Sequence, residues 1–111
     1  MHVIGLKSCD TCRKALKAIR AAGFDPSVQD VRADGLSPDD IATLTTTFGD
    51  KAINRASTTW RGLTDDEKTQ SPEALLAAHP TLLKRPAIQH NGQWTLGWKP
   101  DVAAQVLGHA T

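Results

Sequence analysis

The chain has 111 residues, of which 40% are hydrophobic and 23% are charged, and its formal net charge is +1. These values are ordinary for one globular domain, and they exclude a protein drawn to nucleic acid or to an acidic membrane by its overall charge. Residues 1–5 lead directly into charged residues and cysteine, so we expect no signal peptide and no membrane span. We therefore predict a cytoplasmic protein whose thiols are kept reduced.

The first third of the chain has the pattern strand, helix, strand. Residues 1–6 are apolar and rich in β-branched side chains, which predicts a buried strand. Apolar residues recur at helical spacing over residues 11–23, with Ser8 and Asp10 as candidate caps at the start of this helix. Residues 26–32 predict a second strand, which a right-handed connection would place parallel to the first.

The middle of the chain predicts helices. Residues 37–49 begin with a Ser-Pro pair followed by two aspartates and end at glycine, which is typical of a capped helix. Residues 71–80 repeat the Ser-Pro-acid start and end at proline. The stretch between them, residues 50–70, predicts short helical pieces joined by polar loops.

The last third of the chain predicts a hairpin and a helix. Asn91-Gly92 lies between alternating stretches, as in a type I′ turn, and residues 99–110 predict a final amphipathic helix. The element order predicts an α/β protein with a thioredoxin-like fold, in which helices flank a four-stranded mixed sheet. We expect a single domain over residues 1–111 with a helical insertion at about 36–80. In this arrangement a cis-proline often begins the strand after the insertion, and Pro86 is the candidate.

Both cysteines of the chain lie in one C-x-x-C motif, Cys9 and Cys12, for which we considered four interpretations. A structural disulfide would close a very small loop, and zinc would need two further ligands from histidines at no recognisable spacing. Inert buried thiols fit poorly with the polar flanks in "KSCDTCRK". A motif that follows a strand and opens a helix favours redox or nucleophilic chemistry instead.

The position of the motif predicts different roles for its two thiols. Cys9 falls at a helix N-terminus, where free N–H groups and the helix dipole stabilise a thiolate, and Lys7 and Arg13 add positive charge. Cys12 follows one turn later on the same face, so it can attack an adduct formed on Cys9. We therefore predict Cys9 as the nucleophile and Cys12 as the resolving thiol.

The segments "GLKSCDTCRKALKAI" and "LLKRPAI" resemble the arsenate reductase family of the ArsC type, which also contains the Spx-type regulators. The segment "TTWRGL" between them resembles the YffB-like branch, proposed to contain glutathione-dependent thiol reductases. The motifs fall in family order and extend over essentially the whole chain. The resemblance implies the thioredoxin-like fold and a cytoplasmic location, and we expect no bound metal or cofactor.

The resemblance also assigns roles to basic residues. In the reductases of the family the first cysteine attacks arsenate, arginines hold the anion, and glutathione with glutaredoxin resolves the adduct. Cys9 matches this nucleophile, Arg85 matches an anion-binding arginine, and Arg55 matches a second one, with Arg61 as a rival. Lys99 stands where the third arginine is expected, and lysine lacks the planar fork that binds an oxyanion with two hydrogen bonds.

Cys12 divides the family-based interpretation into two hypotheses. Classical glutaredoxin-coupled members have no cysteine at this position, whereas Spx-type regulators use one as a redox switch. The first hypothesis is a glutaredoxin-like thiol oxidoreductase, with glutathione as co-substrate or a glutaredoxin- or thioredoxin-type reductant as partner, and with arsenate as a narrower substrate. The alternative is a regulator that binds the C-terminal domain of the RNA polymerase α-subunit. Neither hypothesis involves direct binding of nucleic acid or of a membrane.

Overall fold

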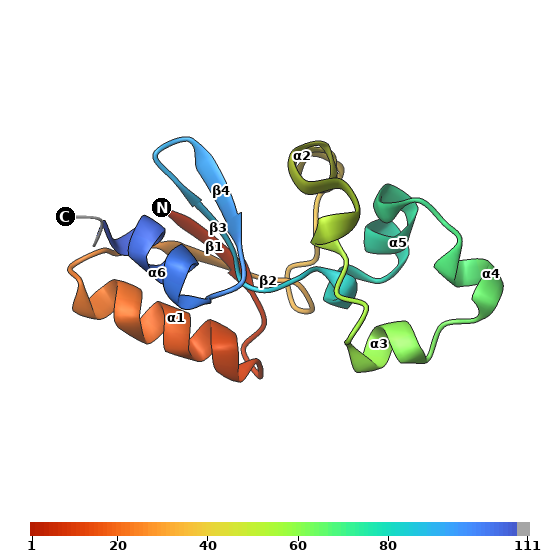
Figure 1. The fold of residues 1–111 in the computed structure, drawn as a ribbon, viewed down its shortest axis with the longest axis horizontal. Helices are drawn as coiled ribbons and strands as arrows, with labels where there is room; N and C mark the ends of the chain where they lie inside the picture. Colours follow the sequence, from red (N-terminus) through yellow and green to blue (C-terminus); the bar gives the residue numbers. More distant parts are fainter. Residues whose placement is uncertain (109–111) are drawn as a thin grey trace. The chain divides into compact units, whose positions relative to one another are not determined.

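The computed structural model describes residues 1–108. The chain forms two compact units, one made of residues 1–30 with the segment from residue 85 onward, the other of residues 31–84. The first unit contains the sheet and two helices (Figure 1): β1 (His2–Gly5), α1 (Asp10–Ala21), β2 (Ser27–Asp30), β3 (Ala87–His90), β4 (Gln93–Leu96) and α6 (Pro100–Leu107). The second is helical: α2 (Pro38–Phe48), η1 (Gly49–Ala52), α3 (Thr58–Arg61), α4 (Asp65–Lys68), α5 (Pro72–Ala78) and η2 (Pro80–Leu82).

The four strands form one mixed sheet in the order β2-β1-β3-β4. β1 pairs with β2 in parallel, so that Gly5 lies opposite Asp30, and it pairs antiparallel with β3, so that Val3 lies opposite Ile88. The parallel β1–α1–β2 connection confirms the arrangement predicted from the sequence. Together with the β3–β4 hairpin, it forms the thioredoxin-like fold that was expected.

One hydrophobic cluster of the first unit lies on a single face of its sheet. Val3 and Ile88 are fully buried on neighbouring strands and pack against Ile19 of α1 and Val106 of α6. Because side chains alternate between the faces of a strand, this contact places α1 and α6 on the same face. Figure 1 shows the two helices side by side there. Full burial of each such aliphatic side chain contributes about 1.5–3 kcal/mol to folding.

The start of α1 differs from the sequence prediction. Ser8 and Asp10 were candidate caps, but the N-cap residue is Cys9, and no side chain caps the helix. Asp10 is the first helical residue, and its carboxylate instead accepts a hydrogen bond from Arg13 at 2.6 Å. The predicted caps are therefore wrong, because the chain enters the helix one residue later than Ser8 would require. The consequence is that a thiol occupies the capping position.

The elements that follow confirm the predictions for the helical segment and for the hairpin. Ser37 caps α2 in a capping box with Asp40, and Gly49 ends the helix. Asn91 and Gly92 have φ angles of 53° and 77°, as the type I′ turn requires. The last helix ends at Leu107, and residues 109–111, which include the end of the predicted helix, lie outside the described residues.

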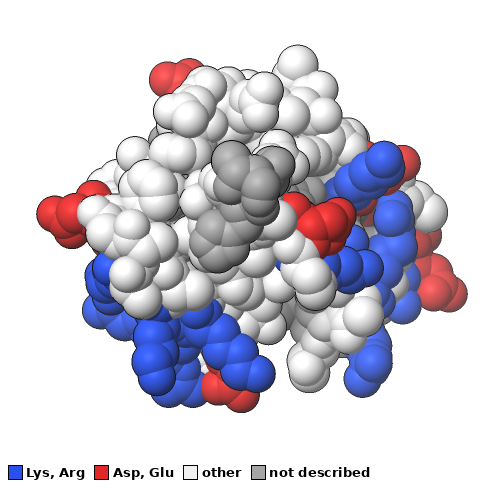
Figure 2. Space-filling view, turned by 60° about the vertical axis from the view of Figure 1, so that its left-hand side comes forward, with Lys and Arg blue, Asp and Glu red and all other residues white. Residues whose placement is uncertain are grey.

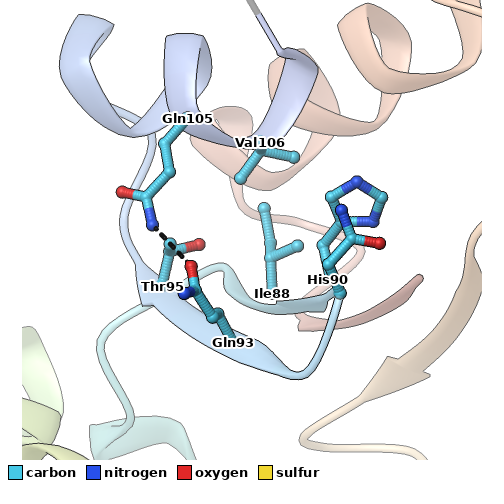
Figure 3. Close-up of a pocket in the computed structure, with 7 residues that line it drawn as sticks. Ile88, His90, Gln93, Thr95, Gln105 and Val106 are labelled. Atoms are coloured by element: carbon cyan, nitrogen blue, oxygen red, sulfur yellow. Dashed lines mark hydrogen bonds between the residues drawn. The ribbon is translucent and has the colours of Figure 1, made fainter.

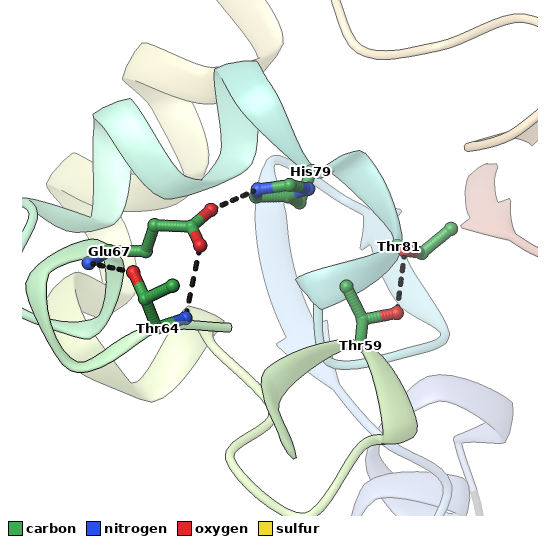
Figure 4. Close-up of polar contacts among 5 residues, drawn as sticks. All are labelled: Thr59, Thr64, Glu67, His79 and Thr81. Atoms are coloured by element: carbon green, nitrogen blue, oxygen red, sulfur yellow. Dashed lines mark hydrogen bonds and ion pairs between the residues drawn. The ribbon is translucent and has the colours of Figure 1, made fainter. Parts of the chain in front are cut away.

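The helical unit is held together by packing and by short polar contacts. α2 packs against α5, and Leu44, Leu75 and Leu76 of these two helices are buried. Figure 4 shows a capping box at α4, in which Thr64 and Glu67 bond each other's backbone, while the Glu67 carboxylate lies 3.4 Å from His79 at the end of α5. None of the helices in residues 1–108 has the length and hydropathy of a membrane span.

We predict that Gly92→Ala lowers the free energy of unfolding by about 1–2 kcal/mol. A Cβ at Gly92 meets no atom within 4 Å, so the loss comes from its φ of +77°, which is costly for an L-residue. Chemical denaturation of the purified variant measures this. Asn91→Gly is the matched control and should have little effect, because glycine adopts the left-handed conformation readily. Equal stability of Gly92→Ala and the native protein would contradict the prediction.

Candidate active site

The C-x-x-C motif lies at the carboxyl end of β1, where the chain turns into α1. The Cys9 N–H donates to the Leu6 carbonyl at 2.9 Å, which closes the turn. The Lys7 N–H donates to the carboxylate of Asp30 at 2.9 Å, which ties the turn to the end of β2. These two bonds hold the half-exposed Cys9 at the N-terminus of α1.

The pKa of Cys9 is lowered from its ordinary value. Partial burial opposes ionisation of the thiol, but hydrogen bonds from the backbone and thiol of Cys12 favour the thiolate. The positive charge of Arg85 and the N–H of Thr11 add to this effect. The helix N-terminus therefore favours the thiolate form of Cys9, which is the reactive form of a thiol.

The pKa of Cys12 moves in the opposite direction. Burial raises the pKa of the Cys12 thiol to about 11, and the adjacent Cys9 adds to the increase. The N–H of Leu6 and the charge of Arg85 oppose it without cancelling it. Cys12 is 3% exposed, and both cysteines are free thiols. Cys12 is thus protonated when Cys9 is a thiolate, and the protonated thiol can donate a hydrogen bond to it.

Gly5 leaves room for the Cys12 sulfur. A Cβ built on Gly5 would lie 3.0 Å from Sγ and 3.3 Å from Cβ of Cys12. Distances this short are rare between non-bonded carbon and sulfur atoms, so α1 can lie this close to β1 because residue 5 has no side chain. Gly5 therefore sets the depth at which Cys12 is buried.

Cys12 also lines a cavity between α1 and the β1–β2 edge of the sheet. Its wall is mainly apolar and includes Val3, Leu16 and Val28, and the other lining residues include Lys7, Arg13, Gln29 and Asp30. The cavity volume is about 40 Å³. Both Cys12 and the buried Asp30 line this cavity.

The structure places Arg85 and Pro86 next to the motif and the other predicted cations on the surface. The Arg85–Pro86 peptide bond is cis, the isomer predicted from the sequence, and Arg85 acts on both thiols through its charge. Lys7 is exposed, and Arg13 is exposed and paired with Asp10. Lys99 is the exposed N-cap residue of α6.

Further exposed cations follow Arg13 along α1, at Lys14, Lys17 and Arg20. Figure 2 shows Lys and Arg side chains at the lower edge of the view, the level at which α1 lies in Figure 1. This helix therefore presents a basic surface that begins at the motif.

Arg55 belongs to the helical unit, where it has its own partners. Its guanidinium lies 3.8 Å from the Asp50 carboxylate and 5.3 Å from the centre of the Trp60 ring. With Lys51 and Lys84, Arg55 lines an open hollow of that unit. The binding of an anion by Arg55 beside the cysteines stays a prediction. Arg61, the rival position, ends α3 and is exposed.

A second cavity of the first unit lies away from the cysteines, between the hairpin and α6 (Figure 3). Thr95, Gln93 and Gln105 line it, and the Gln105 amide donates to the Gln93 carbonyl at 3.5 Å. Within residues 1–108, no three or more His, Cys, Asp or Glu side chains gather in a group that could hold a metal ion. The free thiols of the described residues, Cys9 and Cys12, both belong to the C-x-x-C motif.

The sequence interpretation missed Gly5 and Asp30. Each ends one of two predicted neighbouring parallel strands, and the carboxyl ends of parallel strands lie at the same edge of a sheet. A charged residue that ends a strand beside a reactive motif was the available signal for Asp30. Gly5 gave no such signal, because its importance depends on how closely α1 approaches.

We predict that Arg85→Gln raises the pKa of Cys9, because it removes a positive charge that favours the thiolate. The rate at which iodoacetamide alkylates Cys9, followed by mass spectrometry across a pH series, reports this pKa. The profile should move to higher pH in Arg85→Gln and move less in the control Arg85→Lys, which keeps the charge. Superimposable profiles of Arg85→Gln and native protein would show that Arg85 does not act on Cys9.

We predict that Gly5→Ala destabilises the protein by about 1–3 kcal/mol, since the added methyl overpacks the site against the Cys12 sulfur. The displaced Cys12 should also become easier to alkylate. Denaturant unfolding and the extent of Cys12 modification measure the two effects. The control is the double variant Gly5→Ala with Cys12→Ala. It lacks the sulfur that the added methyl contacts, so it should be more stable than Gly5→Ala alone.

Comparisons with known proteins show the family to which this chain belongs. The sequence profile of the ArsC family matches residues 4–106. An uncharacterized protein of Haemophilus influenzae is 38% identical over 101 residues, which cover 86% of this chain and 89% of that protein. The structure of a protein named YFFB superposes with a TM-score of 0.85 at 27% identity, covering 96% of this chain and 97% of that one.

A second solved structure is similar in the same way. The structure of an arsenate reductase (ArsC) related protein from Brucella melitensis superposes with a TM-score of 0.74 at 28% identity. The match covers 94% of this chain and 91% of that one. The family profile extends over nearly the whole chain, from β1 through the C-x-x-C motif to α6. On this evidence, the chain belongs to the ArsC family.

Proposed function

We propose that the protein is a glutathione-dependent thiol–disulfide oxidoreductase in which Cys9 attacks and Cys12 resolves. The observation that carries the proposal is the placement of two adjacent free thiols, with Cys9 at the N-terminus of α1 and Cys12 buried against Gly5. The pKa of Cys9 is lowered, whereas that of buried Cys12 is raised to about 11. Such a pair contains one thiolate that can attack a disulfide and one protonated thiol that can resolve the mixed disulfide that forms.

The proposed reaction has two exchange steps. The Cys9 thiolate attacks one sulfur of a substrate disulfide, so that a mixed disulfide forms and the other substrate sulfur leaves as a thiolate. Cys12 then loses its proton and attacks the Cys9 sulfur, which releases the second substrate thiol and forms the Cys9–Cys12 disulfide. The substrate gains two electrons and the protein loses two. Two glutathione molecules return the protein to the dithiol and become glutathione disulfide.

Glutathione is proposed because the family suggests it and because Arg85 supplies positive charge at Cys9. Arg85 acts on the thiols, and Lys7, Arg13 and Lys99 belong to the same unit. Glutathione carries two carboxylates, which guanidinium and ammonium groups bind through charge-assisted hydrogen bonds. Arg55 is a further proposed contact. The proposed setting is the cytoplasm, where a glutathione pool keeps thiols reduced.

A narrower version of the proposal takes arsenate as the substrate. It is supported by membership of the ArsC family and by the similar protein of Brucella melitensis described as arsenate reductase related. Lys99 at the position of an expected third arginine weakens oxyanion binding, because a lysine offers a point charge without the planar fork. A disulfide is therefore the preferred substrate.

The test is to treat reduced protein with glutathione disulfide and to identify the products by mass. The native protein should form the internal Cys9–Cys12 disulfide, whereas Cys12→Ser should accumulate glutathione on Cys9. Cys9→Ser should form neither product and should lose at least about 99% of the reduction of a small disulfide by glutathione, because the attacking thiolate is gone.

Two results would contradict the proposal. Turnover that survives in Cys9→Ser would mean that another group attacks. Formation of the internal disulfide without any turnover of disulfide or arsenate would instead favour the redox-switched regulator, which shares the same cysteine pair. If the Cys9→Ser variant still reduced arsenate, reduction of arsenate by Cys9 would be excluded.

A further inference from the structure

The reaction proposed above leaves three exposed cations of α1 without a role. Lys14, Lys17 and Arg20 follow Arg13 along this helix. Arg13 is paired with Asp10 at 2.6 Å. The other three cations form no ion pair with a carboxylate among residues 1–108. Because the formal net charge of the chain is only +1, this helix carries a local excess of positive charge that the chain as a whole lacks.

These cations divide between two sides of α1. Lys17 and Arg20 follow Arg13 at intervals of four and seven residues, so the three lie along one side of the helix, and we call them the basic row. Leu16 adjoins this row, and Leu16 and Arg13 both line the cavity between α1 and the β1–β2 edge. The basic row therefore borders that cavity. Lys14 is two residues from Leu16, about 200° around the helix, and lies on the other side.

The cavity beside the basic row is apolar and opens at the surface. Leu16 of α1 and Val28 of β2 both line it, and Val28 is the exposed large hydrophobic side chain of residues 1–108, at 45%. One exposed valine is ordinary at a protein surface, but this one continues an apolar cavity. The cavity volume is about 40 Å³, whereas a cavity of about 150 Å³ binds benzene, so this one fits the end of an aliphatic side chain and no aromatic ring.

The charged residues that line this cavity expose positive charge. Lys7 and Arg13 are exposed. Asp30 lines the cavity as well, but it is 6% exposed and its carboxylate accepts the Lys7 N–H bond at 2.9 Å. A molecule that approaches the groove between the basic row and β2 therefore contacts cations at its rim and apolar side chains inside it.

The basic row begins close to the reactive cysteine. Cys9 is the N-cap residue of α1, and Arg13 lies about one turn further along the helix. The rise along the helix from Cys9 to Arg20 is about 16 Å, which about five residues of extended chain cover. A chain whose sulfur is bonded to Cys9 can therefore reach the whole row within about five residues of its own cysteine.

We infer that the groove between the basic row and β2 binds an acidic segment of a protein substrate. The carboxylates of this segment lie over the basic row, and one of its aliphatic side chains enters the cavity beside Val28. The inference rests on the proposed function and names its substrate class, disulfides carried by acidic protein segments. Charge complementarity selects this occupant, since a basic segment is repelled and the phosphate backbone of a nucleic acid offers no aliphatic side chain.

The test uses synthetic peptides of about eleven residues with a central cysteine, two valines, and glutamates on both sides, so that either chain direction along the groove is covered. Matched peptides have glutamines or lysines in place of the glutamates. Each cysteine is joined to thiopyridine as a mixed disulfide. Cys9 attacks the peptide sulfur and becomes bonded to it, while thiopyridine leaves, takes up a proton from solvent and is followed by its absorbance. Each rate is divided by the rate with mercaptoethanol, an uncharged thiol, to remove the intrinsic reactivity of the peptide.

The native protein should react at least about fivefold faster with the glutamate peptide than with the glutamine peptide at low salt, and most slowly with the lysine peptide. Salt of about 0.5 M should largely remove the difference, because it screens exposed charges. Lys17→Gln combined with Arg20→Gln should reduce the advantage of the glutamate peptide at least about threefold. This variant should react with dithiodipyridine, a small uncharged disulfide, at the native rate.

Lys14→Gln is the matched control, since it removes a charge from the other side of the same helix and should keep the preference for the glutamate peptide. Equal rates with the glutamate and glutamine peptides in the native protein would overturn the inference. A preference that survives in the variant Lys17→Gln with Arg20→Gln would also overturn it, because cations at Cys9 would then account for the selectivity.

Substitution of Val28 tests the apolar part of the groove. Val28→Ser should slow the reaction of the glutamate peptide at least about twofold, and should not slow a version of that peptide with serines in place of its valines. Val28→Ile keeps an aliphatic side chain and should retain the native rate. If the valine and serine versions reacted equally fast with the native protein, no aliphatic side chain would enter the cavity and the inference would be wrong.

Two other occupants are tested with the same variants. Binding of a fluorescent single-stranded oligonucleotide that is tighter than binding of the glutamate peptide, and is lost in Lys17→Gln with Arg20→Gln, would identify nucleic acid as the occupant. A dimer in sedimentation that this variant dissociates would identify a second copy of the chain. Either result overturns the inference. Absence of any reaction of Cys9 with dithiodipyridine would instead contradict the proposed function, so the two failures are distinguishable.

Discussion

The parallel pairing of β1 with β2 is the constraint on which the candidate site depends. It places Gly5 opposite Asp30 at the edge of the sheet where the chain turns into α1. The Asp30 carboxylate then receives the Lys7 N–H, which holds the turn that leads to Cys9. Each later feature of the first unit, including the depth of Cys12 and the shape of the adjoining cavity, follows from this edge. A strand of four residues thereby positions a reactive helix terminus.

The two thiols differ because one helix turn places them in different environments. Cys9 lies at the cap position, where the helix offers N–H groups and no side chain takes the capping role. Cys12 lies one turn deeper, against Gly5 and away from water. Hydrogen bonding lowers the pKa of the first and desolvation raises the pKa of the second. The missing Ser or Asp cap, which contradicts the sequence prediction, is thus what leaves the helix N–H groups available to a sulfur.

Much of the fold could be predicted from the sequence because its signals are local. The Ser-Pro start of α2, the Asn91-Gly92 turn and the apolar spacing of α1 each depend on a few neighbouring residues. The C-x-x-C motif belongs to this class as well, and its place after a strand indicated that Cys9 lies at the helix N-terminus. The exact first residue of α1 could not be predicted, since Ser8, Cys9 and Asp10 compete for one position and the turn bonds to Leu6 and Asp30 decide among them.

The sequence by itself determined the mixed α/β fold, the helix that begins at the motif, and the different roles expected of Cys9 and Cys12. These follow from periodicity and from i, i+3 spacing, which hold wherever the helix packs. The tertiary structure alone decided that Asp30 and Cys12 line one cavity and that Gly5 determines how deeply the sulfur is buried. Both facts join residues from separate strands and a helix, so they depend on strand register and helix approach. Those distances are set by packing of the whole unit, which no local pattern in the chain records.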